Sequence, residues 1–226
     1  MLPELKYKLL EKIWDDANAA AMEEIKANPD YAFVHPFDHP TIWKGNSTVI
    51  HEMKQQLGNT VPGCIIASCG GGGLLTGIIQ GLDEIGWSHV PVVAMETEGA
   101  DCLAASVAAN KLVTLPDITS IAKSLGSRTV CQQLFDYTKD HNIISHTITD
   151  TAAVDACIKF ADDHRMLVEP ACGASLAVIY SGDIQKLQGT GKLPKDLDNI
   201  VVVVCGGNSV SMQTMESYKM LISSTT

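Results

Sequence analysis

A run of four consecutive glycines is the most informative chemical feature of the sequence. The run, Gly70 to Gly73, follows the apolar segment Cys64–Ser68 and precedes an apolar, helix-like segment that begins at Leu74. Glycine permits positive φ and close approach of the backbone. Successive N–H groups of such a turn can therefore converge on an anion, helped by the partial positive charge at the start of a helix. The pattern predicts a phosphate-binding loop between a strand and a helix.

Two common phosphate motifs fit this loop poorly. A P-loop has a lysine directly after its glycines, where this chain has Leu74, and the dinucleotide fingerprint needs a third glycine where it has Leu75. A mobile turn that uses glycine only for a tight bend is the alternative interpretation. Ordering four glycines costs roughly 0.5 to 1 kcal/mol each relative to alanine, which disfavours that alternative.

A second glycine turn follows the most apolar segment, residues 200–205. It begins with Cys205, Gly206 and Gly207. Ligands of doubly wound sheets bind at the carboxyl ends of strands, so the two glycine turns could face one pocket. Cys205 has no Cys or His partner at metal-ligand spacing, which argues against zinc; taken alone, it is typical of a buried, inert thiol.

Short apolar segments alternate with helical patterns along the chain. Strands are predicted at residues 31–34, 64–68, 90–95, 143–148 and 200–205. Helices are predicted at residues 2–25, 41–57, 74–85, 101–109, 128–141, 151–164, 172–187 and 210–222. This alternation implies βαβ crossovers, so the predicted fold class is α/β, with a mostly parallel sheet and helices on both faces.

Composition and charge exclude several classes of function. The 226 residues are 46% hydrophobic and 19% charged, which suits a soluble globular protein. Sixteen Lys and Arg against 26 Asp and Glu give a net charge of −10, so nucleic acid and anionic membranes are poor partners. No apolar run reaches the ~20 residues of a membrane span, and the charged N-terminus is unlike a secretory signal, so we expect a cytoplasmic location. The seven cysteines form no CxxC pair and are expected to be reduced and mostly buried.

Several ordered motifs resemble the L-serine dehydratase / L-threonine deaminase family, and its animal-type branch in particular. They are SCGGGGLL (residues 68–75), METEGA (95–100), VEPACGA (168–174) and VCGGN (204–208), with the upstream string VHPFDHPTIWKG (34–45). The resemblance runs from about Ile13 to the C-terminal helix. It implies a tryptophan synthase β-like fold (PLP fold type II) and the cofactor pyridoxal 5'-phosphate (PLP). The implied reaction removes water from L-serine, and usually L-threonine, to give pyruvate or 2-oxobutanoate plus ammonia, in amino-acid metabolism and gluconeogenesis.

The resemblance also assigns cofactor contacts. The PLP phosphate would lie in the cradle of Gly70, Gly71, Gly72, Gly73 and the Leu74 amide, and Cys205 would lie beside the pyridine nitrogen. A neutral thiol stabilises a pyridinium far less than a carboxylate does. β-Elimination tolerates this weaker electron sink, because the hydroxyl leaves as the α-proton is removed.

A monovalent-cation site, usually for potassium, is implied next to the glycine loop. Glu96 matches its carboxylate ligand, and the matching carbonyls are those of Gly70, Ala100, Leu125 and Ser127. Such an oxygen-only shell suits an alkali cation. A solvated carboxylate after a strand is the alternative interpretation of Glu96. For Glu169, the simpler interpretation is that its charge and the fixed φ of Pro170 favour a helix start.

The chain departs from the family at the residue that does the chemistry. A PLP eliminase needs a lysine that forms the Schiff base with PLP and moves the α-proton; the family carries it in a Ser-Phe-Lys-x-Arg-Gly stretch. Lys44, Lys123 and the other lysines lie in different motifs, and the Ser-Ser-x-Gly-Asn segment, whose Asn contacts PLP, is also missing. We therefore expect an N-terminally truncated dehydratase that has no catalytic residue of its own and is inactive alone. Residues 1–34 would be a remnant of the small domain and residues 35–226 the large PLP-binding domain.

Two other hypotheses remain open on the sequence. The first is a non-catalytic homologue that pairs with full-length subunits, and the second is an unrelated nucleotide-binding α/β protein. Within the family, a sulfur-substrate lyase or an enzyme acting on D-serine is also possible. A small amino-acid substrate and a homodimer are the family expectation, and stabilisation by PLP rather than by nucleotides would discriminate between the classes.

Overall fold

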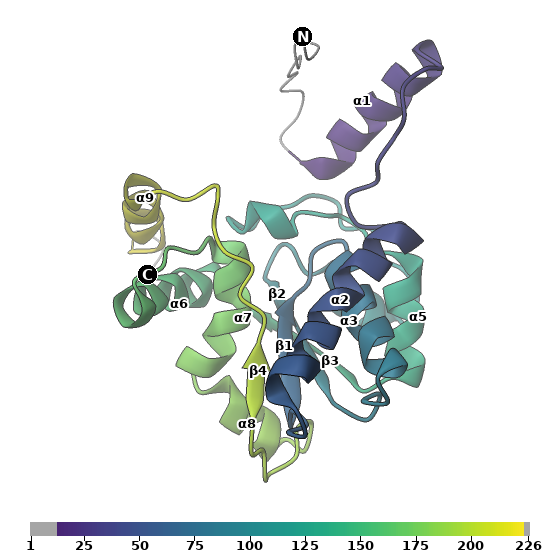
Figure 1. Cartoon of the computed structure of the whole chain (residues 1–226). Coiled ribbons are helices and arrows are strands. Elements are labelled where there is room, and N and C mark those ends of the chain that lie inside the picture. Colours follow the sequence, from purple (N-terminus) through teal and green to yellow (C-terminus); the bar gives the residue numbers. More distant parts are fainter. Residues whose placement is uncertain (1–12, 224–226) are drawn as a thin grey trace.

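The computed structural model describes residues 13–223. They fold into an α/β structure, in which helices cover both faces of a parallel sheet (Figure 1). The sheet has four strands in the order β3-β2-β1-β4, and every neighbouring pair is parallel. The strands are β1 (Cys64–Ser68), β2 (Val92–Thr97), β3 (Ile143–Ile148) and β4 (Ile200–Val202). The chain reverses its winding between β1 and β4, so these strands flank the topological switch point, where ligands of such folds bind. The predicted fold class is confirmed.

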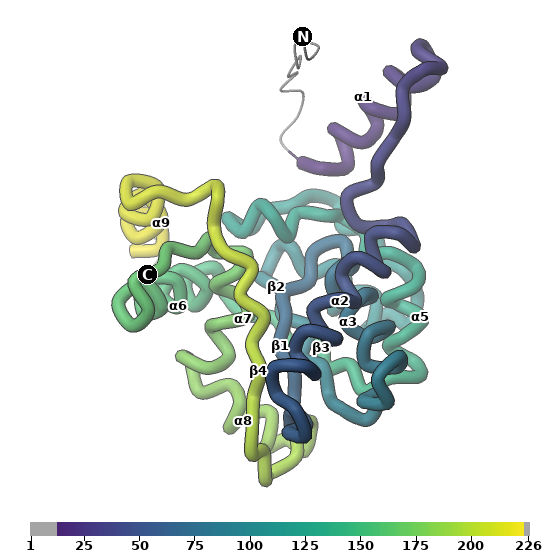
Figure 2. The backbone as a smooth tube through the Cα atoms, in the orientation of Figure 1, coloured from purple at the N-terminus to yellow at the C-terminus, as the bar shows by residue number. Residues whose placement is uncertain are grey.

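The helices of the described residues form a layer on each face of the sheet. They are α1 (Trp14–Ala27), α2 (Pro40–Leu57), α3 (Gly73–Glu84), α4 (Cys102–Ala109), α5 (Gln132–Asp140), α6 (Asp150–His164), α7 (Pro170–Tyr180), α8 (Asp183–Gly189) and α9 (Met212–Ser223), with a 3-10 turn η1 (Lys123–Leu125). Helices α2, α3, α4 and α5 cover one face, and α6, α7 and α8 cover the other. Helix α1 projects from the body, while α9 lies against α6 (Figure 2).

The central strands are apolar because both of their faces are buried. Ile65 of β1 packs into the cluster under α2 and α3, and the next residue, Ile66, packs into the cluster under α6 and α7. Val92 and Val93 of β2 repeat this division. Burying one such side chain contributes about 1.5–3 kcal/mol, so the two layers hold the sheet from both sides.

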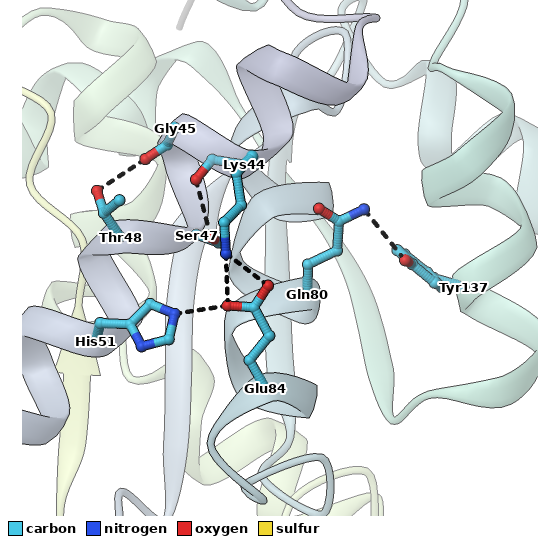
Figure 3. Close-up of polar contacts among 8 residues, drawn as sticks. All are labelled: Lys44, Gly45, Ser47, Thr48, His51, Gln80, Glu84 and Tyr137. Carbon is cyan, nitrogen blue, oxygen red and sulfur yellow. Dashed lines mark hydrogen bonds and ion pairs between the residues drawn. The ribbon is translucent and has the colours of Figure 1, made fainter.

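Polar contacts tie the outer surfaces of α2, α3 and α5 together (Figure 3). Lys44 Nζ lies 2.8 Å from a carboxylate oxygen of Glu84, and His51 Nε2 lies 2.6 Å from the other. Gln80 of α3 donates to the Tyr137 hydroxyl of α5 at 3.4 Å. These residues lie on the solvent side of the helices and do not line the cavity described below.

Three predicted strands differ from the structure. The strand predicted at 90–95 is β2, which begins and ends two residues later. Residues 31–34 are exposed and form no strand, because no described strand lies beside them to complete the hydrogen bonds. The strand predicted at 200–205 ends at Val202, after which only the Val203 N–H bonds to Ile66 O of β1, at 2.8 Å. The chain then leaves the sheet and runs over the surface toward α9 (Figure 2).

Two predicted helices are also wrong in extent. The segment 172–187 is two helices, because Gly182 adopts a left-handed conformation with φ 76° and separates α7 from α8. The segment 128–141 becomes helical only at Gln132. Its first residues are held elsewhere, since the Arg128 N–H donates to Asp15 Oδ2 and its Nε to Leu115 O. Of the helix predicted at 2–25, residues 2–12 lie outside the described residues.

Candidate functional site

A cavity of about 500 Å³ opens at the carboxyl ends of β1 and β4. Its lining includes the glycine loop, residues 123–127, the start of α7 and the turn after β4, together with residues of α1, of α2 and of the segment between them. All six residues predicted to contact a cofactor line it, namely Gly70, Gly71, Gly72, Gly73, Leu74 and Cys205. The two glycine turns of the sequence therefore face one cavity.

Tight packing explains why the glycine loop admits no side chain. A Cβ added to Gly71 would lie 2.4 Å from the ring atoms of Phe37, and one added to Gly73 would lie 2.5 Å from Phe37 O. Gly72 also has φ 93°, a left-handed value that favours glycine. The interpretation of the glycines as a mobile turn does not fit this arrangement, since neighbouring segments enclose the loop.

The loop presents a row of unused hydrogen-bond donors to the cavity. Its ends are fixed, because Cys69 N–H donates to Met95 O at 2.8 Å and Gly71 O accepts from Cys131 N–H at 2.9 Å. Within residues 13–223, the N–H groups from Gly71 to Leu74 donate to no protein acceptor. They lie at the start of α3, where the helix dipole adds partial positive charge. The arrangement suits a phosphate group.

Beside the loop, the cavity wall is formed by η1 and the start of α7. The η1 turn lies so close that a Cβ on Gly70 would be 3.1 Å from Leu125 Cα. Ser68 Oγ donates to Ala171 O at 2.7 Å, which ties the end of β1 to the first turn of α7. Lys123 is the only cationic side chain among the described residues that line the cavity, and Glu169 the only carboxylate.

Cys205 is exposed, so its interpretation as a buried thiol is wrong. The other six cysteines are buried, and all seven are free thiols, as the sequence predicts. Cys205 is exposed, unlike the other cysteines, because β4 ends at Val202. The chain leaves the sheet there, and Cys205 lines the cavity. Partial desolvation of its sulfur raises the pKa of the Cys205 thiol, although the residue as a whole is exposed, and the neighbouring Cys172 and Glu169 raise it further.

Glu96 is fully buried on β2, which contradicts its interpretation as a solvated carboxylate. Its two oxygens accept the N–H groups of Leu103 and Ala104 at the start of α4, each at 2.8 Å. Burial raises the pKa of Glu96 to about 8, and these two hydrogen bonds oppose the shift. No Lys, Arg or His of the described chain forms an ion pair with it.

The other predicted cation ligands lie in the same region. Gly70, Leu125 and Ser127 line the cavity, and the Gly70 carbonyl lies 3.7 Å from the thiol of Cys102, which follows Glu96 and Ala100 at the start of α4. Among the described residues, no group of three or more His, Cys, Asp or Glu side chains could hold a metal ion. A cation here would therefore depend on backbone carbonyls and the single carboxylate of Glu96.

Several lining residues received no role from the sequence. They are Trp14, Phe37, Asn46 and Ser124. The Phe37 ring lies 4.7 Å from the Trp14 ring and also covers Gly71. Neither periodicity nor glycine spacing points to these residues, because the fold gathers them from separate segments.

The fold and the site together define a doubly wound α/β protein with a glycine loop at its switch point, whose N–H groups from Gly71 to Leu74 have no acceptor among the described residues. Residues 7–206 match the family described as "Pyridoxal-phosphate dependent enzyme". The chain belongs to this family.

Curated relatives are similar over almost all of the chain. It is 49% identical over 212 residues to "Serine dehydratase-like" of Rattus norvegicus, which covers 94% of this chain and 64% of the relative. It is 48% identical, with the same coverage, to "L-serine dehydratase/L-threonine deaminase" of Bos taurus. The chain thus spans less than two thirds of the length of these relatives.

Solved structures agree on the fold. A fungal L-serine ammonia-lyase from Rhizomucor miehei has a TM-score of 0.85 and 36% identity, covering 92% of this chain and 64% of that one. Threonine deaminase isoform 2 from Solanum lycopersicum has a TM-score of 0.80 at 20% identity, covering 96% and 56%. The PLP fold type II architecture is therefore confirmed. Separately, no helix between residues 13 and 223 has the length and apolar character needed to cross a membrane.

Proposed function

We propose that the protein binds PLP by its phosphate and that its site serves the β-elimination of water from L-serine, and from L-threonine. The products are pyruvate or 2-oxobutanoate, and ammonia. The observation that carries the proposal is the row of unpaired N–H groups from Gly71 to Leu74, which faces a cavity that Cys205 also lines. Membership of the PLP-dependent family and 49% identity to a serine dehydratase-like relative support it.

The chain's own residues would hold and orient the cofactor. The loop N–H groups bind the phosphate dianion, and the partial charge at the start of α3 favours it. Phe37 packs on the loop and keeps its backbone in place, with Trp14 against the Phe37 ring. Cys205 meets the pyridine nitrogen as a neutral thiol, because its pKa is raised. When bound, PLP supplies the electron sink for the α-carbon, and a weak sink suffices for loss of a β-hydroxyl.

The proposal includes a potassium ion beside the glycine loop. A buried carboxylate without an ion-pair partner is costly, and Glu96 meets only two N–H groups. A cation held by Glu96 and by the carbonyls of Gly70, Ala100, Leu125 and Ser127 would supply the missing charge. Oxygen ligands of this kind suit an alkali cation.

The lysine chemistry is the part that these 226 residues do not provide in the family's form. No lysine here follows Ser-Phe, and Lys123 of the cavity lies in the sequence AKSLG. We therefore propose that this chain alone binds the cofactor without eliminating water, and that residues 35–226 are the PLP-binding domain. A homodimer and a cytoplasmic location complete the proposal.

Cofactor binding is tested by thermal unfolding of the full chain with PLP, with pyridoxal and with ATP. A ligand present at a hundred times its dissociation constant stabilises by about 2.7 kcal/mol. We expect stabilisation by PLP and little by pyridoxal, which lacks the phosphate. Equal effects of the two, or stabilisation by ATP alone, would contradict the proposal.

The reaction is tested in a chimera that joins the Ser-Phe-Lys-bearing N-terminal segment of the rat relative to this chain. We expect the chimera to release pyruvate from L-serine and to become covalently labelled by PLP and borohydride at that lysine. The unmodified chain is the control and should release none. Covalent labelling without any pyruvate would refute the proposed reaction but not cofactor binding.

A further inference from the structure

Glu169 is a cavity residue whose side chain forms no capping hydrogen bond in its own helix. It occupies the N-cap position of α7, with φ −81° and ψ 161°, and Pro170 is the first helical residue, two positions before the predicted start of this helix. Ser, Thr, Asp or Asn at this position usually caps the first N–H groups of the helix. The Glu169 carboxylate forms no such cap bond, so its oxygens are available for contacts outside α7, while its charge still favours the helix start.

The carboxylate contacts the turn that carries Cys205 instead. Ser209 Oγ donates to Glu169 Oε2, and the Glu169 N–H donates to Gly206 O at 3.1 Å. One residue therefore holds both ends of the four-residue segment between Gly206 and Ser209. Hydrogen bonds to charged groups are roughly twice as strong as neutral ones, which makes the Ser209 contact the more important of the two.

Close packing against the backbone of residues 168–169 also fixes this turn. A Cβ on Gly207 would lie 2.5 Å from Glu169 N and 2.8 Å from Val168 Cα, so the two backbones touch. The Cys172 thiol also lies next to this turn. Burial raises its pKa, and hydrogen bonds from the N–H groups of Gly206 and Cys205 oppose that shift. Beyond Val203 the turn has no ladder hydrogen bonds, because β4 has ended.

We propose that Glu169 is a positioning residue, which holds the Cys205 turn against the start of α7 so that the Cys205 sulfur faces the cofactor ring. The cofactor part of this statement rests on the proposed function. The hold on the turn is independent of it. The charged and titratable groups around Cys205 are Glu169 and Cys172 of the α7 start, and Lys123 of η1 lines the same cavity.

The test measures alkylation of Cys205 by iodoacetamide, followed by mass spectrometry of the full chain with and without PLP. Cys205 is the one exposed cysteine, so its reaction is separable from that of the six buried thiols. In Glu169→Ala and Ser209→Ala we expect roughly tenfold faster alkylation, the effect of losing one hydrogen bond to a charged group. We also expect PLP to protect Cys205 less well in both variants.

Glu169→Gln separates position from charge. Its amide oxygen can still accept from Ser209, so PLP should protect Cys205 as in the parent chain. Loss of the negative charge should still speed alkylation near neutral pH, because Glu169 raises the pKa of Cys205. Glu216→Gln on α9 is the matched control, since this residue is exposed and its carboxylate forms no ion pair among the described residues; it should behave as the parent.

The outcomes separate the two proposals. Unchanged alkylation and unchanged protection in both Glu169→Ala and Ser209→Ala would overturn the positioning role. Faster alkylation in these variants, with no protection by PLP even in the parent chain, would support the hold on the turn and refute the cofactor site. If Glu169→Ala fails to fold, the exposed Ser209→Ala variant decides alone.

Discussion

The two glycine turns of this protein look alike in the sequence but differ in the structure. In the first turn, after β1, the phenyl ring and carbonyl of Phe37 lie where the Cβ atoms of Gly71 and Gly73 would be. In the second, after β4, Gly206 has φ 102° and nothing within 4 Å of its Cβ position. Gly71 and Gly73 therefore need glycine because of close packing, whereas Gly206, unlike its closely packed neighbour Gly207, needs it because of backbone conformation.

This difference divides the site into two ends with different properties. The phosphate end is enclosed by packed segments, so its N–H groups are fixed before a ligand arrives. The Cys205 end lies outside the sheet and is held chiefly by contacts with Glu169. Substitutions at the first end should therefore damage the fold and phosphate binding together, and those at the second should change the ring contact more than the fold.

The largest loss of stability and of PLP binding is expected from Gly73→Ala. Its Cβ would lie 2.5 Å from Phe37 O, a backbone atom that cannot move aside alone. Overpacking of this kind costs typically about 1–3 kcal/mol, and the phosphate cradle would be distorted as well. Urea unfolding and PLP titration measure the two losses. Gly45→Ala on α2 is the control: nothing lies within 4 Å of that Cβ, and alanine in a helix is favoured by up to about 1 kcal/mol. Parent-like behaviour of Gly73→Ala would contradict the packing explanation.

Gly206→Ala should have a smaller effect of a different kind. The new methyl group meets no atom, so only the left-handed conformation opposes it, at roughly 1–2 kcal/mol. We expect phosphate affinity, measured by competition of inorganic phosphate with PLP, to stay near that of the parent. A loss of phosphate affinity as large as in Gly73→Ala would show that the two ends are not separate.

Glu96, behind the first turn, should make stability depend on pH. Its folded pKa is raised to about 8, so the folded state holds this proton more tightly than the unfolded state. Ionisation therefore costs stability, which should fall as pH rises from about 4.5 to about 8. Urea unfolding in tetramethylammonium buffers should show this fall for the parent and not for Glu96→Gln. Potassium should lessen the fall in the parent alone, and a fall of equal size in both proteins would contradict the assignment.

The smallest change in stability and in PLP binding is expected from Glu84→Gln on the outer face of α3. The hydrogen bonds from Lys44 and His51 hold the pKa of Glu84 below its usual range, so the contribution of this network is lost as pH falls through that pKa. The groups are exposed and screened by salt. Thermal unfolding should barely change, and PLP binding should not change at all. A clear loss of PLP binding would mean that the outer helix face is coupled to the cavity.

The sequence predicted most of what local patterns determine. The bounds of β1 and β3 agree with the prediction to the residue, because glycine and other turn-forming residues end these apolar runs. The two glycine turns were also predicted to lie at strand ends. Residues 31–34 have the composition of a strand and fail for lack of a neighbour, which no local pattern reveals.

The rest of the site depends on contacts between distant segments. Glu96 is buried because β2 lies inside the sheet between β1 and β3, and Cys205 is exposed because β4 ends early. Phe37 reaches the glycine loop from more than thirty positions earlier in the chain. Glu169 looks like an ordinary helix start until its contact with Ser209 is seen.

The central claim is that the N–H groups from Gly71 to Leu74 hold the phosphate of PLP. The most direct measurement is the ³¹P resonance of PLP bound to the full chain, followed between pH 5 and 8. Free phosphate monoesters take up a proton near pH 6. The account predicts that the bound resonance stays at the dianion position across this range, because the loop favours the doubly charged form. A bound phosphate that titrates like free PLP would contradict it.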